Sequence, residues 1–406
     1  MSPLDTAYRA HWIKLIKRLE TSFFYYDLDW LTEHLKYLDS HKDPDIKFWY
    51  ACKANPLSAI LKIFRNLNFG VDIASLGELE QALSVGLKST EILATGPCKS
   101  KKYLQSLLKN EVEVVVLESL NQALWLNEVS REMNQKSKVL LRVQLTFDGG
   151  HSVLGGNSIT PFGVTPDEWQ TLNFKELNNL EVIGLHAFQW GNILDLEQLK
   201  NIWWKTTTEC LELADKMNFK LQVLDLGGGL GVPYESHQKA LDFEAVTALL
   251  AELKTKFKLP AIWMELGRYA VAECGYYLSQ IADRKQTRGL DLLVLEGGIN
   301  HIARPALTNQ AFPAHPLRVT DKPFSTSTTR FQVHGPLCTA LDKLGQFDLP
   351  SDLDVGDWIV FSKAGAYGFT EAMPFFLCHP LPAEVIQFKG DVVTPRTPKT
   401  STDWLV

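Results

Sequence analysis

Residues 46–86 read IKFWYACKANPLSAILKIFRNLNFGVDIASLGELEQALSVG, and their pattern indicates the fold class. Residues 46–52 are a short, almost fully apolar run, typical of a buried strand, and residues 56–67 carry apolar side chains at helical spacing. The pattern then repeats, with a strand predicted over 69–74 and a helix over 76–85 that Gly86 ends. Strand and helix therefore alternate, which predicts a parallel sheet.

The same alternation continues on the C-terminal side of this stretch. Helical patterns separate the later apolar runs, for example at 194–217 and 243–256. Further strands are predicted at 91–95, 112–117, 138–145, 180–188, 221–226 and 261–265. Eight strands with crossover helices indicate an α/β protein built on a closed (β/α)8 TIM-like barrel.

After about residue 272 the pattern changes to period-two alternation with frequent Gly and Pro. Strands are predicted at 292–296, 357–362 and 383–388, and the apolar run 23–26 (FFYY) precedes the barrel and is expected to pair with them. We therefore expect a barrel domain over 28–275 and a C-terminal antiparallel β domain, sandwich-like or barrel-like, over 276–406, with residues 1–27 packing on the latter. The tail from residue 393 is expected to be poorly ordered.

Composition excludes several classes of protein. The net charge of −6, from 41 basic and 47 acidic residues, gives no support to nucleic-acid binding. There is no apolar run long enough to span a membrane and no secretory h-region, so no membrane partner is expected. The six cysteines are scattered, without a C-x-x-C pair or zinc spacing, which indicates reduced thiols in a cytoplasmic protein and no metal site.

Chemistry-bearing residues cluster where the predicted barrel strands end, which is where barrel active sites form. A lysine after an apolar strand, here Lys53, suggests a buried amine of lowered pKa that can act as a nucleophile, although a rim salt bridge is the alternative. Other strands end in Asp72, in His186 with Phe188, in a Gly-Gly-Gly run at 227–229, and in Glu265 with Gly267 and Arg268.

The triple glycine is neither a P-loop nor a dinucleotide turn. The glycines follow the seventh predicted strand, and Arg268 follows the eighth. Loops at these two places often bind phosphate in barrels, so a phosphate site is favoured, and a tight turn is the alternative. An amine and a phosphate cradle on one barrel rim suggest pyridoxal phosphate. The Glu265 carboxylate could then keep the pyridine nitrogen protonated and so strengthen the electron sink, or it could pair structurally with Arg268.

Taken together, the motifs resemble the fold-type III pyridoxal-phosphate decarboxylases, the family of ornithine, arginine and diaminopimelate decarboxylases. The matching segments are YACKAN at 50–55, GVDIAS at 70–75, LGGG at 226–229, ELGRY at 265–269, GPLCTALD at 335–342 and AGAY at 364–367. The resemblance spans nearly the whole chain. It implies a carboxy-lyase that works as a head-to-tail homodimer.

The resemblance also implies roles for single residues. Lys53 would bond covalently to the cofactor, with Asp72 and Glu78 beside it, and Glu265 would face the ring nitrogen. The phosphate would be held by Gly228, Gly229, Gly267, Arg268 and Tyr367. Cys338 and Asp342 would reach in from the partner subunit, with Cys338 protonating the product; a small buried apolar residue is the alternative role for this cysteine.

Departures from the family pattern concern the ring and the substrate. Phe188 occupies the place of the ring-stacking His, with His186 on the same side of the strand, and Trp190-Gly191-Asn192 replaces a Gly-Ser phosphate contact. Thr339 follows the cysteine, at a position where ornithine and diaminopimelate decarboxylases carry an acidic residue. Gly297 stands where ornithine decarboxylases carry a second acidic residue, in the strand before the β-domain loop. A buried substrate ammonium would then lack a counter-ion, which is costly.

These losses resemble the siderophore-biosynthesis branch, whose members act on citrate-conjugated diamino acids. The expected activity is removal of the α-carboxylate from a citrylornithine-type or citryl-diaminopropionate substrate, in rhizoferrin-like biosynthesis, with Thr339 and Arg304 meeting the substrate; a surface role is the alternative for Arg304. Alternative functions are decarboxylation of free ornithine or diaminopimelate, an amino-acid racemase, which Glu265 opposes, and a catalytically inactive regulator.

Overall fold

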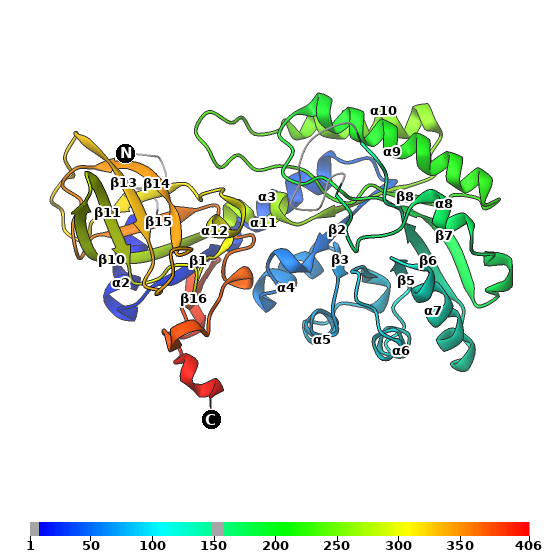
Figure 1. Cartoon of the computed structure of the whole chain (residues 1–406), viewed down its shortest axis with the longest axis horizontal. Coiled ribbons are helices and arrows are strands. Elements are labelled where there is room, and N and C mark those ends of the chain that lie inside the picture. Colours follow the sequence, from blue (N-terminus) through cyan, green and yellow to red (C-terminus); the bar gives the residue numbers. More distant parts are fainter. Residues whose placement is uncertain (1–7, 148–157, 406) are drawn as a thin grey trace. The chain divides into compact units, whose positions relative to one another are not determined.

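The computed structural model describes residues 8–147 and 158–405, which divide into two compact units (Figure 1). The barrel unit comprises Thr32–Pro233 and His237–Ala270. The β unit comprises Met1–Leu31, Tyr234–Ser236 and Val271–Val406. Among the described residues no helix has both the length and the apolar character needed to cross a membrane.

In the described part of the barrel unit, eight parallel strands close on themselves in chain order, because the first pairs with the last. They are β2 (Ile46–Ala51), β3 (Gly70–Ile73), β4 (Ile92–Ala94), β5 (Val114–Leu117), β6 (Ser137–Arg142), β7 (Leu180–His186), β8 (Val223–Asp225) and β9 (Ile262–Leu266). Helices lie around them (Figure 1) and cover the outer faces, so the strands are buried on both sides and read as continuous apolar runs. The predicted barrel is confirmed.

The helices of this unit alternate with the strands along the chain. They are α3 (Leu28–His41, shared with the β unit), α4 (Ser58–Asn66), α5 (Leu76–Ser84), α6 (Lys101–Lys109), α7 (Leu120–Glu132), α8 (Pro166–Gln170), α9 (Leu196–Lys216), α10 (Phe243–Phe257) and α11 (Arg268–Val271). Short 3-10 turns lie at Cys52–Ala54 (η1), Ser89–Glu91 (η2) and Phe174–Glu176 (η3). Ser75, Ser100, Ser119 and Asp195 cap α5, α6, α7 and α9 by accepting a hydrogen bond from the N–H three residues on.

In the described part of the β unit, nine strands form one sheet with a main path β14-β13-β11-β10-β1-β16-β17. The strands are β1 (Phe23–Asp27), β10 (Gly275–Thr287), β11 (Leu290–Leu295), β12 (Ala314–Leu317), β13 (Thr328–His334), β14 (Lys343–Pro350), β15 (Trp358–Ser362), β16 (Ala383–Phe388) and β17 (Asp391–Arg396). Its helices and turns are α2 (Arg9–Leu19), α12 (Arg304–Thr308), η4 (Ala272–Cys274), η5 (Phe369–Glu371), η6 (Phe376–Cys378) and η7 (Ser401–Trp404).

The sheet confirms the predicted β domain and adds two features. The FFYY strand β1 pairs antiparallel with β10 and parallel with β16, and β11 pairs parallel with β13, so the sheet is mixed. The expectation of a poorly ordered tail from residue 393 is wrong for the part that pairs with other strands. β17 pairs antiparallel with β16, and Lys399 forms a β-bridge with Leu381. Helix α2 buries Trp12, Leu15 and Ile16 in the core of this unit.

Candidate active site

Lys53 lies in the turn η1, two residues beyond the end of β2. The hydroxyl of Tyr50 donates to the Asn55 carbonyl at 2.8 Å, and the Tyr50 ring stacks on Phe64 at 3.8 Å, so this turn is held from inside the barrel wall. Lys53 Nζ lies 3.9 Å from Asp72 Oδ2. The expectation that Lys53 is buried is wrong: its side chain is 41 % exposed, because β2 ends at Ala51 and leaves the lysine at the open rim.

Asp72 lies on β3, next to the amine, and is buried. Thr95, just after β4, donates its hydroxyl to Asp72 Oδ1 at 2.5 Å. Burial and the nearby charge of Glu265 raise the pKa of Asp72 to about 8, against the opposing effect of Lys53. At neutral pH the carboxyl can therefore hold a proton beside Lys53.

Glu78 is the second carboxyl on this side of the rim. Ser75 caps α5 by accepting from the Glu78 N–H, and Glu78 Oε2 in turn accepts from the Ala74 N–H at 2.6 Å. Burial raises the pKa of Glu78. The capping arrangement places this side chain close enough to Lys53 for the amine to oppose that rise.

Glu265, His186 and Asp225 form a buried cluster at the ends of β9, β7 and β8. His186 Nε2 lies 3.2 Å from Glu265 Oε1, and the register pairs His186 with Asp225 on the neighbouring strand. Burial by itself raises the pKa of Glu265, but His186, Lys53 and Arg142 together lower it to about 2. Glu265 is therefore an anion, and its observed partner is His186 rather than Arg268.

Asp225 was not among the predicted site residues. Its position at the end of the seventh barrel strand could have indicated a role in the site. Burial and the charge of Glu265 raise its pKa, while the Gly227 N–H donates to Oδ1 at 2.8 Å. Within the described residues, Asp225 Oδ2 and Glu265 Oε1 are buried without a well-formed hydrogen bond. The three ligand atoms of the cluster lie within 4.8 Å of one another. Such unsatisfied buried groups suit a polar ligand at this position.

The triple glycine packs against Phe188 and β9. A Cβ on Gly227 would lie 2.4 Å from Phe188 Cβ, and one on Gly228 would lie 2.5 Å from the Glu265 carbonyl oxygen. The tight-turn interpretation therefore has a structural basis. In the described residues the N–H groups of Gly228 and Gly229 donate no hydrogen bond, which leaves them able to bind an anion. Gly267 and Arg268 follow β9, and Arg268 begins α11.

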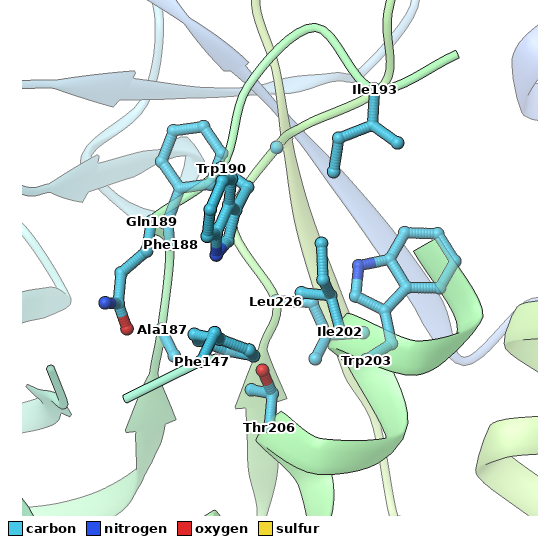
Figure 2. A pocket seen from close by; sticks show the side chains of 11 residues that line it. Phe147, Ala187, Phe188, Gln189, Trp190, Ile193, Ile202, Trp203, Thr206 and Leu226 are labelled. Atoms are coloured by element: carbon cyan, nitrogen blue, oxygen red, sulfur yellow. The ribbon is translucent and has the colours of Figure 1, made fainter. Parts of the chain in front are cut away.

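Two loops join beside this turn. Ile193 N–H donates to Gly229 O and Gly231 N–H to Ile193 O, both at 2.8 Å, and the side chain of Asn192 accepts from Val232 N–H at 2.9 Å. Figure 2 shows the small cavity that they border, lined by Phe147, Ala187, Phe188, Gln189, Trp190, Ile193, Ile202, Trp203, Thr206, Leu226 and Gly228. At about 10 Å³ it has room for a single water molecule, so its own side chains fill it.

A buried ion pair that the sequence analysis missed lies beside Phe188. Arg142 Nη1 donates to Glu118 Oε1 at 2.9 Å, and Nη2 donates to the Phe188 carbonyl at 3.1 Å. Glu118 Oε2 also accepts from Gly163 N–H at 3.0 Å. Lys99 is buried nearby and donates to Gly96 O; burial lowers its pKa to about 8. No local signal in the sequence predicts this network, because its charged residues lie at or beyond the ends of different strands and meet only in the folded barrel.

The remaining candidate residues belong to the β unit. Cys338 is exposed in the turn between β13 and β14, which excludes the alternative of a small buried residue. Thr339 contributes its hydroxyl to the same turn by accepting from Leu341 N–H at 3.2 Å. Asp342 is buried; its oxygens accept from Ile299 N–H and Leu337 N–H, both at 2.8 Å. Asp342 thus supports the turn that presents Cys338.

Arg304 and Tyr367 contact each other in the β unit. The guanidinium carbon lies 4.5 Å from the centre of the Tyr367 ring. Arg304 Nη1 also donates to both carboxylate oxygens of Glu371, at 2.9 and 2.8 Å. The alternative of a surface arginine is wrong, because Arg304 is 9 % exposed. The cation expected to meet a substrate carboxylate already has a carboxylate partner in Glu371.

The chain is similar to several known proteins. Residues 29–272 match the family model described as pyridoxal-dependent decarboxylase, pyridoxal binding domain. The chain is 27 % identical to the L-glutamyl-[BtrI acyl-carrier protein] decarboxylase of Niallia circulans, covering 96 % of this chain and 94 % of that one. It is also 27 % identical to the 2-[(L-alanin-3-ylcarbamoyl)methyl]-2-hydroxybutanedioate decarboxylase of Staphylococcus aureus, covering 88 % and 92 %.

Among solved structures, diaminopimelate decarboxylase from Helicobacter pylori complexed with L-lysine has the same fold. It matches with a TM-score of 0.87 at 24 % identity, covering 97 % of this chain and 98 % of that one.

Proposed function

Because the chain belongs to the pyridoxal-dependent decarboxylase family, we propose that it removes the α-carboxylate of an acylated diamino acid of the citrylornithine type. One observation carries the substrate assignment. The residue after Cys338 is Thr339, whose hydroxyl accepts a hydrogen bond inside its own turn, so this position offers no carboxylate to a substrate ammonium. An acylated distal nitrogen carries no charge and needs no counter-ion. The staphylococcal relative supports this proposal, since its substrate name describes an alanine joined through an amide to a 2-hydroxybutanedioate.

The barrel unit suits the family's cofactor, pyridoxal phosphate. Lys53 would hold its aldehyde carbon, the Glu265 anion would face its ring nitrogen, and the undonated N–H groups of Gly228 and Gly229, with Arg268, would take its phosphate. The observation on which this fit rests is that Asp225 Oδ2 and Glu265 Oε1 are buried without a well-formed hydrogen bond. When bound, pyridoxal phosphate supplies an electron sink for the bond that breaks at the substrate Cα.

The side chains of this chain carry the remaining steps. Asp72, held by Thr95, keeps a carboxyl 3.9 Å from the Lys53 amine and orients it. His186 keeps Glu265 ionised, which maintains a negative charge at the base of the site. The Cys338 thiol donates the proton that replaces the departing carboxylate, so that the substrate loses carbon dioxide and gains one proton at Cα. In this proposal Cys338 acts in the site of a partner copy, in a homodimer.

A substrate panel tests the proposal. Purified protein with pyridoxal phosphate is given citrylornithine, citryl-diaminopropionate, free ornithine and free diaminopimelate, and carbon dioxide and amine products are quantified. We expect the citryl conjugates to have the highest kcat/KM. Faster turnover of free ornithine or diaminopimelate would overturn the acylated-substrate proposal and favour polyamine or lysine biosynthesis.

Lys53→Ala is the control for the chemistry. Its side chain is two-fifths exposed, so the variant should fold normally while losing the cofactor absorbance band and all turnover. Retention of both would contradict the assignment of Lys53.

A second candidate substrate is a glutamyl group on a carrier protein. The Niallia circulans relative, which aligns with 96 % of this chain, favours it. A neutral thioester would also need no carboxylate at position 339. Adding a glutamyl-loaded carrier protein to the panel separates the two candidates. At a low enzyme concentration, only the citryl conjugate or only the glutamyl-loaded carrier protein should be consumed.

A further inference from the structure

Tyr367 has a backbone conformation that a non-glycine residue rarely adopts. Its φ is +54°, in the left-handed region, so the surrounding structure must hold it there. The chain before it is fixed, because Ala364 N–H donates to Gly275 O at 2.8 Å and Gly365 N–H donates to Ala272 O at 3.0 Å. These bonds fix the backbone that leads into Tyr367, but they do not orient its ring.

Arg304 packs on that ring. It begins the short helix α12, whose last residue, Thr308, donates its hydroxyl to the Arg304 carbonyl at 2.9 Å. Its guanidinium lies over the Tyr367 ring at 4.5 Å. A buried cation over an aromatic face is a stronger contact than the same pair in water. The ring therefore rests against a planar cation that is itself almost excluded from solvent.

Glu371 determines where the guanidinium lies. Both of its oxygens accept from Arg304 Nη1, at 2.9 and 2.8 Å, and Glu371 is only four residues after Tyr367. Arg304 thus bridges the two ends of the 367–371 turn. Phe369 lies between the two ends of this turn, and the centre of its ring is 6.2 Å from the centre of the Phe24 ring. This contact holds the middle of the turn against β1.

We propose that Arg304 is a positioning residue for Tyr367, with Glu371 as the residue that orients and neutralises Arg304. Because Glu371 cancels its charge, Arg304 does not serve as the cation for a carboxylate on the distal part of the substrate. The functional part of this inference rests on the proposed function and on the role that the family resemblance implies for Tyr367, which is to contact the cofactor phosphate. The structural part, that Arg304 holds the turn, does not.

The first experiment measures hydrogen exchange of peptides covering residues 363–372 in cofactor-free protein. Arg304→Met and Glu371→Gln should both speed exchange in these peptides. Arg330→Met is the matched control, because it makes the same change at an ion pair of the same unit that is 61 % exposed on both sides. Exchange that is unchanged in Arg304→Met, or raised equally by Arg330→Met, would overturn the positioning role.

The second experiment measures the Kd of pyridoxal phosphate for the same proteins and for Tyr367→Phe. Arg304→Met should weaken binding by about tenfold, the effect of losing a desolvated cation–π contact. Adding Tyr367→Phe should weaken it little further, and Arg304→Lys should restore only part, because it lacks the planar fork. A different result would overturn the proposal: the Kd of pyridoxal phosphate is unchanged in Arg304→Met, while the KM rises for citryl conjugates and stays the same for an acetyl conjugate. Arg304 would then be a substrate ligand.

The two measurements separate the possible failures. If exchange rises in Arg304→Met while neither it nor Tyr367→Phe changes the Kd, the positioning role is retained. The assignment of Tyr367 to the cofactor, which belongs to the proposed function, is then the part that fails.

Discussion

His186 Nε2 lies 3.2 Å from Glu265 Oε1, and the two side chains are 1 % and 3 % exposed. They come from β7 and β9, which are separated in the barrel by β8 and its Asp225. A buried carboxylate without a counter-charge would take up a proton, because burial raises its pKa. The imidazole and the more distant Lys53 and Arg142 prevent this and keep Glu265 ionised.

We therefore predict that His186→Leu raises the pKa of Glu265 above its present value of about 2. Protonated Glu265 cannot balance a charged ring nitrogen, so the acid limb of kcat/KM should move to higher pH by about one unit or more. Phe188→Leu is the control; this residue packs on Gly227 and leaves the His186–Glu265 contact intact. An acid limb at the same pH in both variants would contradict this role of His186.

Asp72 should make the stability of the cofactor-free protein depend on pH. Its pKa is about 8 in the folded protein, mainly through burial, against an ordinary 3.8. The unfolded chain then loses this proton near pH 4 and the folded chain only near pH 8. Stability from this group is thus complete below about pH 4 and lost as the pH rises towards 8. Asp72→Asn stays neutral, so its Tm should fall less than that of the wild type between pH 5 and pH 8.

Asp352→Asn is the control for the pH experiment. Hydrogen bonding from Ser325 N–H and Arg318 lowers the pKa of Asp352, so it is ionised in both folded and unfolded chains above pH 5. Its replacement should change the Tm equally at pH 5 and pH 8. If Asp72→Asn behaves in the same way, the raised pKa of Asp72 is wrong.

The buried Arg142–Glu118 pair should be far more important for stability than an exposed pair. Glu118→Leu leaves the Arg142 guanidinium buried without its carboxylate, and removal of one partner of a buried pair costs roughly 3–5 kcal/mol. Glu113→Leu breaks the Lys138–Glu113 pair, which is more than 40 % exposed on both sides, and should cost at most about 1 kcal/mol. Thermal and urea unfolding of both variants measures the difference; equal losses would contradict the burial argument.

Cys338 should affect catalysis without affecting stability. Its side chain is exposed, so Cys338→Ser should leave the Tm unchanged. If the thiol donates the proton to Cα, kcat should fall by roughly 10²–10⁴-fold, the usual loss of a general acid. Cys98→Ser, at another exposed cysteine, is the control for a non-specific effect of thiol loss. A wild-type kcat in Cys338→Ser would remove this residue from the mechanism.

Much of the barrel could be predicted from local pattern. The alternation around residues 46–86 needs only the two side-chain periods, 2 for a strand and 3.6 for a helix, and the chain order of the strands brings their carboxyl ends to one rim. For this reason the pattern predicts that Lys53, Asp72 and Glu265 lie near one another, and the structure places Lys53 Nζ 3.9 Å from Asp72 Oδ2. The pairing of Glu265 with His186 instead of Arg268 depends on side-chain direction, which the pattern does not contain.

Short-range periodicity is enough to predict the order of the strands and helices and the groups that stand at the strand ends. The pairing of buried charges depends instead on how the folded unit packs. Arg142, the last residue of β6, meets Glu118, which follows the neighbouring strand β5, and Arg304 meets Glu371, which is 67 residues further along the chain. Burial makes an unpaired charge so costly that such partners must be found in space, and spatial proximity depends on the packing of the whole unit rather than on neighbours along the chain.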